Sequence, residues 1–102
     1  MIAAVTDHIT EIEALCRRFG VRRLVVFGSA VDGTFRAGLS DVDFLVELDP
    51  PAGQSRFDAY FGLKEALESL LHSPVDLVDP SALRNPYLAA TVRENQAELY
   101  AA

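Results

Sequence analysis

Apolar residues recur along the first part of the chain at steps of three and four positions. The residues that follow this spacing are Ile9, Ile12, Cys16 and Phe19. Such spacing places them on one face of a helix, predicted over about residues 6–19 with Thr6 as its N-cap. Gly20 is expected to end this helix, because glycine readily adopts the left-handed conformation found at helix C-termini.

Later stretches predict three strands and two further helices. A short apolar run at 24–27 is typical of a strand buried on both faces, and a third short strand is predicted at 75–78. In the strand predicted over 41–48, apolar residues occupy every second position. A helix is expected over about residues 55–72, and a last helix over about residues 85–96, where an Asn-Pro pair provides the N-cap and first turn.

The alternation within 41–48 assigns its side chains to two faces. One face carries Val42, Phe44 and Val46, and the other carries Asp41, Asp43 and Leu45. The order of helices and strands predicts an α/β (α+β) fold: a small mixed β-sheet of three to four strands with helices packed on it. No repeat or linker divides the chain, so we expect one domain spanning residues 1–102.

Composition and charge narrow the possible partners. The chain has 102 residues, half of them hydrophobic, and a formal net charge of −6. Most of the acidic residues follow Arg36, which argues against direct binding of long DNA or RNA. The sequence contains no stretch of membrane-spanning length and no secretory signal, and Cys16 is its only cysteine. We therefore expect a cytoplasmic protein without a membrane association, in which Cys16 is a small buried residue.

A glycine-serine pair follows the first predicted strand. Gly28 permits close approach of a ligand to the backbone, and amides at a turn into a helix can hold an anion. The alternative is a plain strand-ending turn in which Ser29 caps a helix. Gly28 and Gly33 have the spacing of a P-loop, but Thr34 stands where that motif needs lysine, which excludes a P-loop.

Two aspartates near the start of the 41–48 strand are candidates for metal binding. Asp41 and Asp43 are two residues apart, so on a strand their side chains point to the same side. Their separation suits two metal ions lying roughly 3.5–4 Å apart. The alternative is that both carboxylates are simply solvated on an exposed face of the sheet.

A third aspartate lies among apolar residues of the 75–78 strand. A carboxylate there is costly unless it is compensated, and Asp76 would lie beside Asp41 and Asp43 if the two strands are neighbours. Clustered carboxylates repel one another, and a divalent cation removes this repulsion. Oxygen ligands favour Mg²⁺ or Mn²⁺. Asp79, just before a proline, is expected instead to cap the next turn.

These residues together resemble the polymerase-β-type nucleotidyltransferase superfamily. The resemblance rests on Gly28-Ser29, the interval of twelve positions to Asp41, the Asp41-x-Asp43 pair and Asp76, and it covers about residues 24–78. The short chain is most similar to the minimal nucleotidyltransferases, which often act as antitoxins beside HEPN-domain toxins.

The resemblance implies both a reaction and a role for each residue. Asp41, Asp43 and Asp76 would be the catalytic and metal-binding residues, holding two Mg²⁺ ions, with Mn²⁺ as the alternative. Gly28 and Ser29 would hold the β- and γ-phosphates of ATP, the substrate. AMP would be transferred to a tyrosine of the cognate HEPN toxin, and pyrophosphate would leave.

The loop after Ser29 departs from the family pattern. Members commonly have Ala-Arg-Gly there, whereas this chain has Val31-Asp32-Gly33 after Ala30. The phosphate-binding arginine is therefore missing, which could lower or abolish activity. Arg36 is the candidate to replace it as a nucleotide-binding residue, and the alternative is that Arg36 is a solvated loop residue.

Two other functions remain open. The chain could neutralise a partner by occlusion alone, through its last helix or the face formed by Phe57–Leu71. It could also transfer a nucleotide to a small molecule, although enzymes of that kind resemble the same core with an added substrate-binding domain. His8 and His72 have no neighbours spaced like metal ligands, so structural or solvated roles are expected for both.

Overall fold

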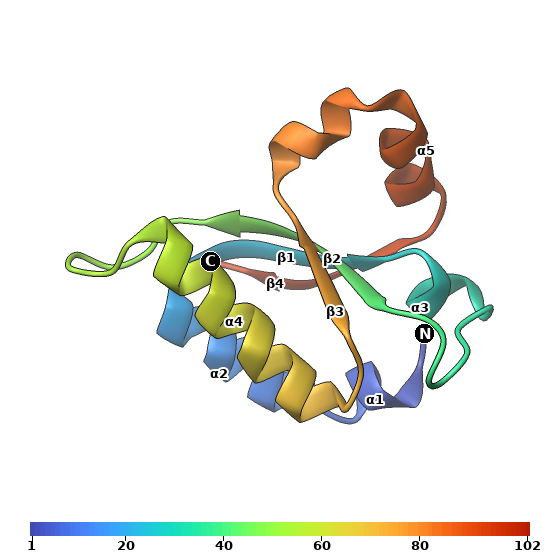
Figure 1. Cartoon of the computed structure of the whole chain (residues 1–102), viewed down its shortest axis with the longest axis horizontal. Coiled ribbons are helices and arrows are strands. Elements are labelled where there is room, and N and C mark those ends of the chain that lie inside the picture. The colour runs from blue at the N-terminus through green and yellow to red at the C-terminus, as the bar shows by residue number, and fades with distance from the viewer.

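Four strands form the centre of the molecule in the computed structural model, which describes residues 1–102. The strands are β1 (Val21–Phe27), β2 (Val42–Leu48), β3 (Val75–Val78) and β4 (Gln96–Ala101). They lie in one mixed sheet in the order β3-β2-β1-β4 (Figure 1). β1 pairs antiparallel with β2 and with β4, and β2 pairs parallel with β3. The predicted small mixed sheet is therefore confirmed.

Helices cover both faces of this sheet. They are α1 (Ala3–Thr6), α2 (Ile9–Phe19), α3 (Ser29–Asp32), α4 (Arg56–Leu71), the 3₁₀ helix η1 (Pro80–Arg84) and α5 (Pro86–Glu94). α2 and α4 lie against one face, and η1 and α5 stand over the other (Figure 1). The longest helix, α4, has 16 residues, and no helix is both long and apolar enough to cross a bilayer.

Capping side chains set where the later helices begin. The Ser55 hydroxyl accepts a hydrogen bond from the Asp58 amide at 3.0 Å at the start of α4. The Asn85 side chain accepts from the Tyr87 amide at 2.9 Å at the start of α5, as the Asn-Pro pair predicts. Asp79 caps η1 by accepting from the Ser81 amide at 2.9 Å, which confirms its predicted capping role.

The alternation within β2 divides the apolar residues between two clusters. Val42, Phe44 and Val46 face α2 and α4 in the larger cluster, and all three are buried. Leu45 faces the other way and packs with Val92 of α5 in a smaller cluster. The two faces predicted for β2 are thus confirmed, and the smaller cluster fixes η1 and α5 above the sheet. Other members of the smaller cluster are Val25, Phe27, Val78, Leu83 and Leu88.

The first helix differs from the prediction, because the chain turns between two helices. Thr6 ends α1 instead of capping a long helix, and its hydroxyl donates to the Ala3 carbonyl at 3.2 Å. The reason is that Val5 is fully buried, while the Ile2 amide donates to the Ala30 carbonyl at 2.8 Å, which holds this segment against α3. His8 is the N-cap of α2, and its Nδ1 donates to the Ala4 carbonyl at 2.7 Å, a structural role.

The sheet also contains a strand that the sequence pattern did not locate. α5 ends at Glu94, close to the predicted end, and the chain then forms β4 along the free edge of β1. The sequence of β4, Gln-Ala-Glu-Leu-Tyr-Ala, is rich in helix-favouring residues and has a weak strand pattern. Pairing with a distant strand overrides local propensity here. β1 is also longer than the predicted 24–27, because it begins at Val21.

Candidate functional site

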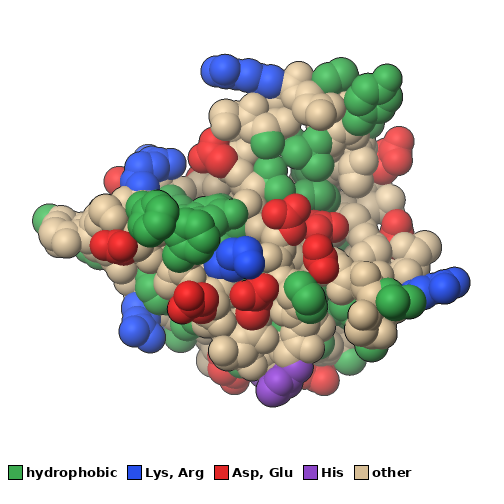
Figure 2. Space-filling view, viewed as in Figure 1, with side chains coloured by type: hydrophobic (Ala, Val, Ile, Leu, Met, Phe, Trp, Pro, Cys, Tyr) green, Lys and Arg blue, Asp and Glu red, His purple; other side chains and the backbone are tan.

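One row of side chains runs across three neighbouring strands at the end of β1. Phe27 of β1 is paired with Asp43 of β2, and Asp43 is paired with Asp76 of β3. All three lie on the sheet face covered by η1 and α5, because Phe27 belongs to the smaller cluster and the side chains alternate along each strand. The fold therefore brings Asp43 and Asp76 side by side, as the sequence predicted. Acidic side chains gather near the middle of the face shown in Figure 2.

Asp43 has the most perturbed carboxyl group of the site. Its pKa is raised from an ordinary 3.8 to about 6, chiefly by partial burial and also by the charges of Asp76 and Asp41. The influence of Asp41 shows that this carboxylate also lies near Asp43, although it precedes β2 and is exposed. A cation bound beside Asp43 would relieve both the burial cost and the repulsion.

Asp76 sits differently from what the sequence suggested. β3 is an edge strand, and its burial alternates so that Val75 and Leu77 are buried while Asp76 is exposed. The argument that an apolar strand makes this carboxylate costly was therefore wrong, because Asp76 faces solvent. Its position opposite Asp43 comes from strand pairing alone, and it leaves the carboxylate accessible to a substrate.

The Gly28 turn abuts the carboxylate of Asp43. Gly28 has φ 74° and ψ −142°, a conformation that favours glycine, and it is the N-cap of α3. A Cβ atom on Gly28 would lie 2.9 Å from Oδ2 of Asp43. Ser29 is the first residue of α3 and not its cap, which corrects the capping alternative. The Gly28 amide donates to the Asn95 carbonyl at 3.2 Å, so the turn is also tied to the start of β4.

Arg36 lies in the exposed loop between α3 and β2. Its amide donates to the Ser40 hydroxyl at 3.0 Å, and its carbonyl accepts from the Ser40 amide at 2.8 Å, closing a small turn just before Asp41. The guanidinium forms no ion pair. The structure thus tethers the backbone of Arg36 near the site, but it does not bring the Arg36 side chain onto the aspartates.

The donor set fits a hard cation whose coordination shell is completed by oxygen atoms of a substrate. No three side chains of the acidic, His or Cys type close around one point to form a ready-made metal site. Mg²⁺ is usually held by one or two carboxylates together with phosphate oxygens and water. A pair of adjacent carboxylates beside a backbone cradle that only glycine fits is suited to this arrangement.

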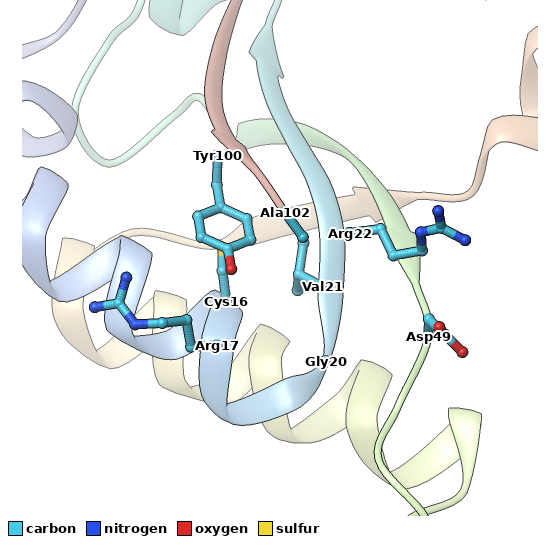
Figure 3. Close-up of a pocket in the computed structure, with 8 residues that line it drawn as sticks. All are labelled: Cys16, Arg17, Gly20, Val21, Arg22, Asp49, Tyr100 and Ala102. Atoms are coloured by element: carbon cyan, nitrogen blue, oxygen red, sulfur yellow. The ribbon is translucent and has the colours of Figure 1, made fainter.

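The largest hollow of the molecule lies at the opposite end of β1 from Gly28. It measures about 580 Å³ and is lined by Cys16, Arg17, Gly20, Val21, Arg22, Asp49, Tyr100 and Ala102. The Tyr100 ring lies over Cys16 with Arg17 beside it, whereas Arg22 and Asp49 lie across β1 (Figure 3). Burial raises the pKa of the Cys16 thiol to about 12, so it stays protonated, in line with the predicted buried role. None of the site aspartates lines this hollow.

Two polar side chains of α4 contact β3 and were not singled out from the sequence. The Tyr60 hydroxyl donates to the Leu77 carbonyl at 2.9 Å, and Oε2 of Glu68 accepts from the Val75 amide at 3.0 Å. The available signal was their spacing of eight residues, which places them on one side of a helix. That spacing is common, and it becomes informative only once β3 is known to lie beside α4.

A small mixed sheet with paired aspartates beside a glycine turn is the arrangement expected of a nucleotidyltransferase. A sequence profile described as "Nucleotidyltransferase domain" matches residues 11–97. The protein adenylyltransferase MntA of Thermococcus cleftensis is 39% identical over 90 residues, which cover 88% of this chain and 84% of that protein. This chain therefore belongs to the nucleotidyltransferase domain family.

Solved structures agree with this assignment. One structure, designated a minimal nucleotidyltransferase, matches with a TM-score of 0.69 and 34% identity, covering 91% of this chain and 90% of that chain. A toxin–antitoxin crystal structure with AMP-PNP matches with a TM-score of 0.64 and 28% identity, covering 92% of this chain and 73% of that one. The recognised family and the predicted fold class are thus confirmed.

Proposed function

We propose that this chain transfers AMP from ATP to a tyrosine of a partner toxin of the HEPN type and so acts as an antitoxin. The observation that carries the proposal is the pairing of Asp43 with Asp76, with the Gly28 turn against the Asp43 carboxylate. The similar MntA is a protein adenylyltransferase, and a similar toxin–antitoxin structure contains an ATP analogue. Both support this choice of nucleotide and partner.

Mg²⁺ is the proposed metal, with Mn²⁺ as an alternative. Asp41, Asp43 and Asp76 would hold two ions. This is supported by the pairing of Asp43 with Asp76 and by the charges of Asp76 and Asp41, which both act on the Asp43 carboxyl. When bound, the ions supply charge neutralisation for the phosphates and for the oxygens that attack and leave. Neutralisation would also return the pKa of Asp43 toward its ordinary value.

The remaining residues position the substrates. The Gly28-Ser29 turn would bind the β- and γ-phosphates through its backbone and the Ser29 hydroxyl, and Arg36 would approach from the neighbouring loop. The acceptor oxygen forms a bond to the α-phosphorus while the bond from that phosphorus to the bridging oxygen of pyrophosphate breaks. Asp76 is exposed and can accept the hydroxyl proton of the acceptor.

The direct test measures AMP transfer to the cognate toxin. Wild-type protein, ATP and Mg²⁺ should add the mass of AMP to the toxin, detected by intact mass spectrometry. Asp43→Asn and Asp76→Asn should each lower the rate by about 100-fold or more, because metal-binding capacity is lost with the carboxylate. An unmodified toxin, or full transfer by Asp43→Asn, would refute the proposal. A reaction without any protein partner tests transfer to small acceptors.

Occlusion without catalysis is a second candidate, favoured by one surface. Phe57 and Phe61 of α4 are 70% and 43% exposed, with ring centroids 4.7 Å apart. They border a hollow of about 210 Å³ that also contains Tyr60 and Val46. Exposed aromatic residues beside a hollow are typical of protein-binding surfaces. Protection of cells by Asp43→Asn, and its loss in Phe57→Ser, would select occlusion over AMP transfer.

A further inference from the structure

The backbone of β3 has an outer edge that no strand covers. The Val42 amide of β2 donates to the Pro74 carbonyl at 2.9 Å, so backbone groups at alternate residues from Pro74 onward point toward β2. The backbone groups of Val75 and Leu77 therefore point away from the sheet. Asp76 lies between these two residues, in a strand of only four residues with one neighbouring strand.

α4 binds this outer edge on both sides of Asp76. Oε2 of Glu68 accepts from the Val75 amide at 3.0 Å, and the Tyr60 hydroxyl donates to the Leu77 carbonyl at 2.9 Å. Pro74 has no amide hydrogen, so the Val75 amide is the first backbone donor of the strand. The two bonds thus hold the backbone directly before and directly after Asp76.

Glu68 is well suited to remain an ionised acceptor. The Val75 amide holds the pKa of its carboxyl below the ordinary value, and Lys64 contributes through an ion pair of 3.3 Å. Hydrogen bonds to a charged acceptor are stronger than neutral ones. Both α4 side chains are only partly exposed, so water competes less for these bonds than it would at an open edge.

We infer that Tyr60 and Glu68 are positioning residues that hold Asp76 opposite Asp43 through the backbone of β3. This inference rests on the proposed function, because Asp76 matters to catalysis only if AMP transfer occurs. This role acts through the β3 backbone and requires no contact between either side chain and the substrates. Loss of either bond lets the short edge strand move, and small displacements of a catalytic group slow chemistry more than they weaken binding.

The test separates the hydrogen-bonding acceptor from the charge. Glu68→Ala and Tyr60→Phe should each lower kcat for AMP transfer about tenfold, with KM for ATP changed by less than about twofold. Glu68→Gln keeps an acceptor oxygen for the Val75 amide and should retain kcat within about threefold. Glu65→Ala removes an exposed carboxylate from the same helix and is the matched control, with unchanged kcat.

Amide hydrogen exchange gives a second readout that needs no activity. In the nucleotide-free protein, the Asp76 and Val78 amides should exchange faster in Glu68→Ala and Tyr60→Phe than in wild type, and at the wild-type rate in Glu65→Ala. Unchanged kcat in both variants, or an equal loss in Glu65→Ala, would overturn the inference. If the wild type transfers no AMP, the proposed function fails. Unchanged amide hydrogen exchange at Asp76 and Val78 in both variants would independently overturn the inference that Tyr60 and Glu68 position β3.

Discussion

The carboxylate of Asp43 packs against the backbone of Gly28 with no room for a side chain between them. A Cβ atom on Gly28 would lie 2.9 Å from Oδ2 of Asp43, and its next contacts would also be with Asp43. Residue 28 therefore has two constraints, since its φ of 74° is unfavourable for other residues as well. The turn and the central aspartate of the site form one unit.

Gly28→Ala should therefore impair both folding and activity. The positive φ costs about 1–3 kcal/mol, and the new methyl group must displace the Asp43 carboxylate. We expect a lower free energy of unfolding in urea titrations and a loss of AMP transfer of at least about tenfold in protein that remains folded.

Gly53→Ala is the matched control for that variant. Gly53 also has a positive φ, of 87°, but a Cβ atom there would meet nothing within 4 Å. It should lose about 1 kcal/mol of stability through backbone strain and keep full activity. Equal losses of activity in the two variants would contradict a specific contact between Gly28 and Asp43.

The raised pKa of Asp43 predicts how stability depends on pH in metal-free buffer. The folded protein keeps this proton up to about pH 6, whereas the unfolded chain releases it near pH 4. Between these values the native state binds more protons, so the contribution of Asp43 to the free energy of unfolding falls as pH rises. Asp43→Asn should therefore be more stable than wild type above pH 6, and the difference should vanish toward pH 4.

The size of this difference is limited by solvent. A pKa raised from 3.8 to about 6 corresponds to at most about 3 kcal/mol, and screening at a half-exposed site reduces this to about 1 kcal/mol. Urea titrations with EDTA at several pH values measure it. Asp79→Ala should show the opposite dependence on pH. The Ser81 amide lowers the pKa of Asp79, so the contribution of Asp79 to the free energy of unfolding is lost as pH falls. A constant difference across pH for Asp43→Asn would refute the assignment.

Arg36→Ala tests whether this residue replaces the missing family arginine. Its guanidinium has no ion-pair partner in the protein, so the free energy of unfolding should change by less than about 0.5 kcal/mol. If the guanidinium binds phosphate oxygens, kcat/KM for ATP should fall about tenfold, the cost of one charge-assisted hydrogen bond. Unchanged kinetics would assign Arg36 to the solvated loop instead.

Gly62→Ala tests the packing of α2 against α4. Alanine is favoured over glycine within a helix by about 1 kcal/mol, yet a Cβ atom on Gly62 would lie 2.6 Å from Cε1 of Phe19. Phe19 is buried, so overpacking of about 1–3 kcal/mol should exceed the gain and leave the variant less stable. In a Phe19→Leu background the same substitution should cost less, and the double-mutant cycle measures the difference. A stabilised Gly62→Ala would contradict the close contact.

Sequence patterns predicted much of the fold because the relevant physics is local. Alternation along β2 predicted which side chains face each helix layer, and the Asn85-Pro86 pair located the start of α5. The pattern failed at β4, since its residues mostly favour a helix and have only a weak strand pattern. The free edge of β1, far away in the sequence, makes the segment a strand.

For the site, residue type and spacing, together with the resemblance to the nucleotidyltransferases, singled out Asp41, Asp43, Asp76 and the Gly28 turn as candidates. Whether they meet depended on strand pairing between β2 and β3, a contact over more than thirty residues that local preferences do not encode. The exposure of Asp76 and the two bonds from α4 to β3 likewise arise from how helix and edge strand pack together. The sequence alone thus indicated which residues could bind a metal or a nucleotide. The tertiary structure decided which of them lie close together, because that depends on how the strands pair.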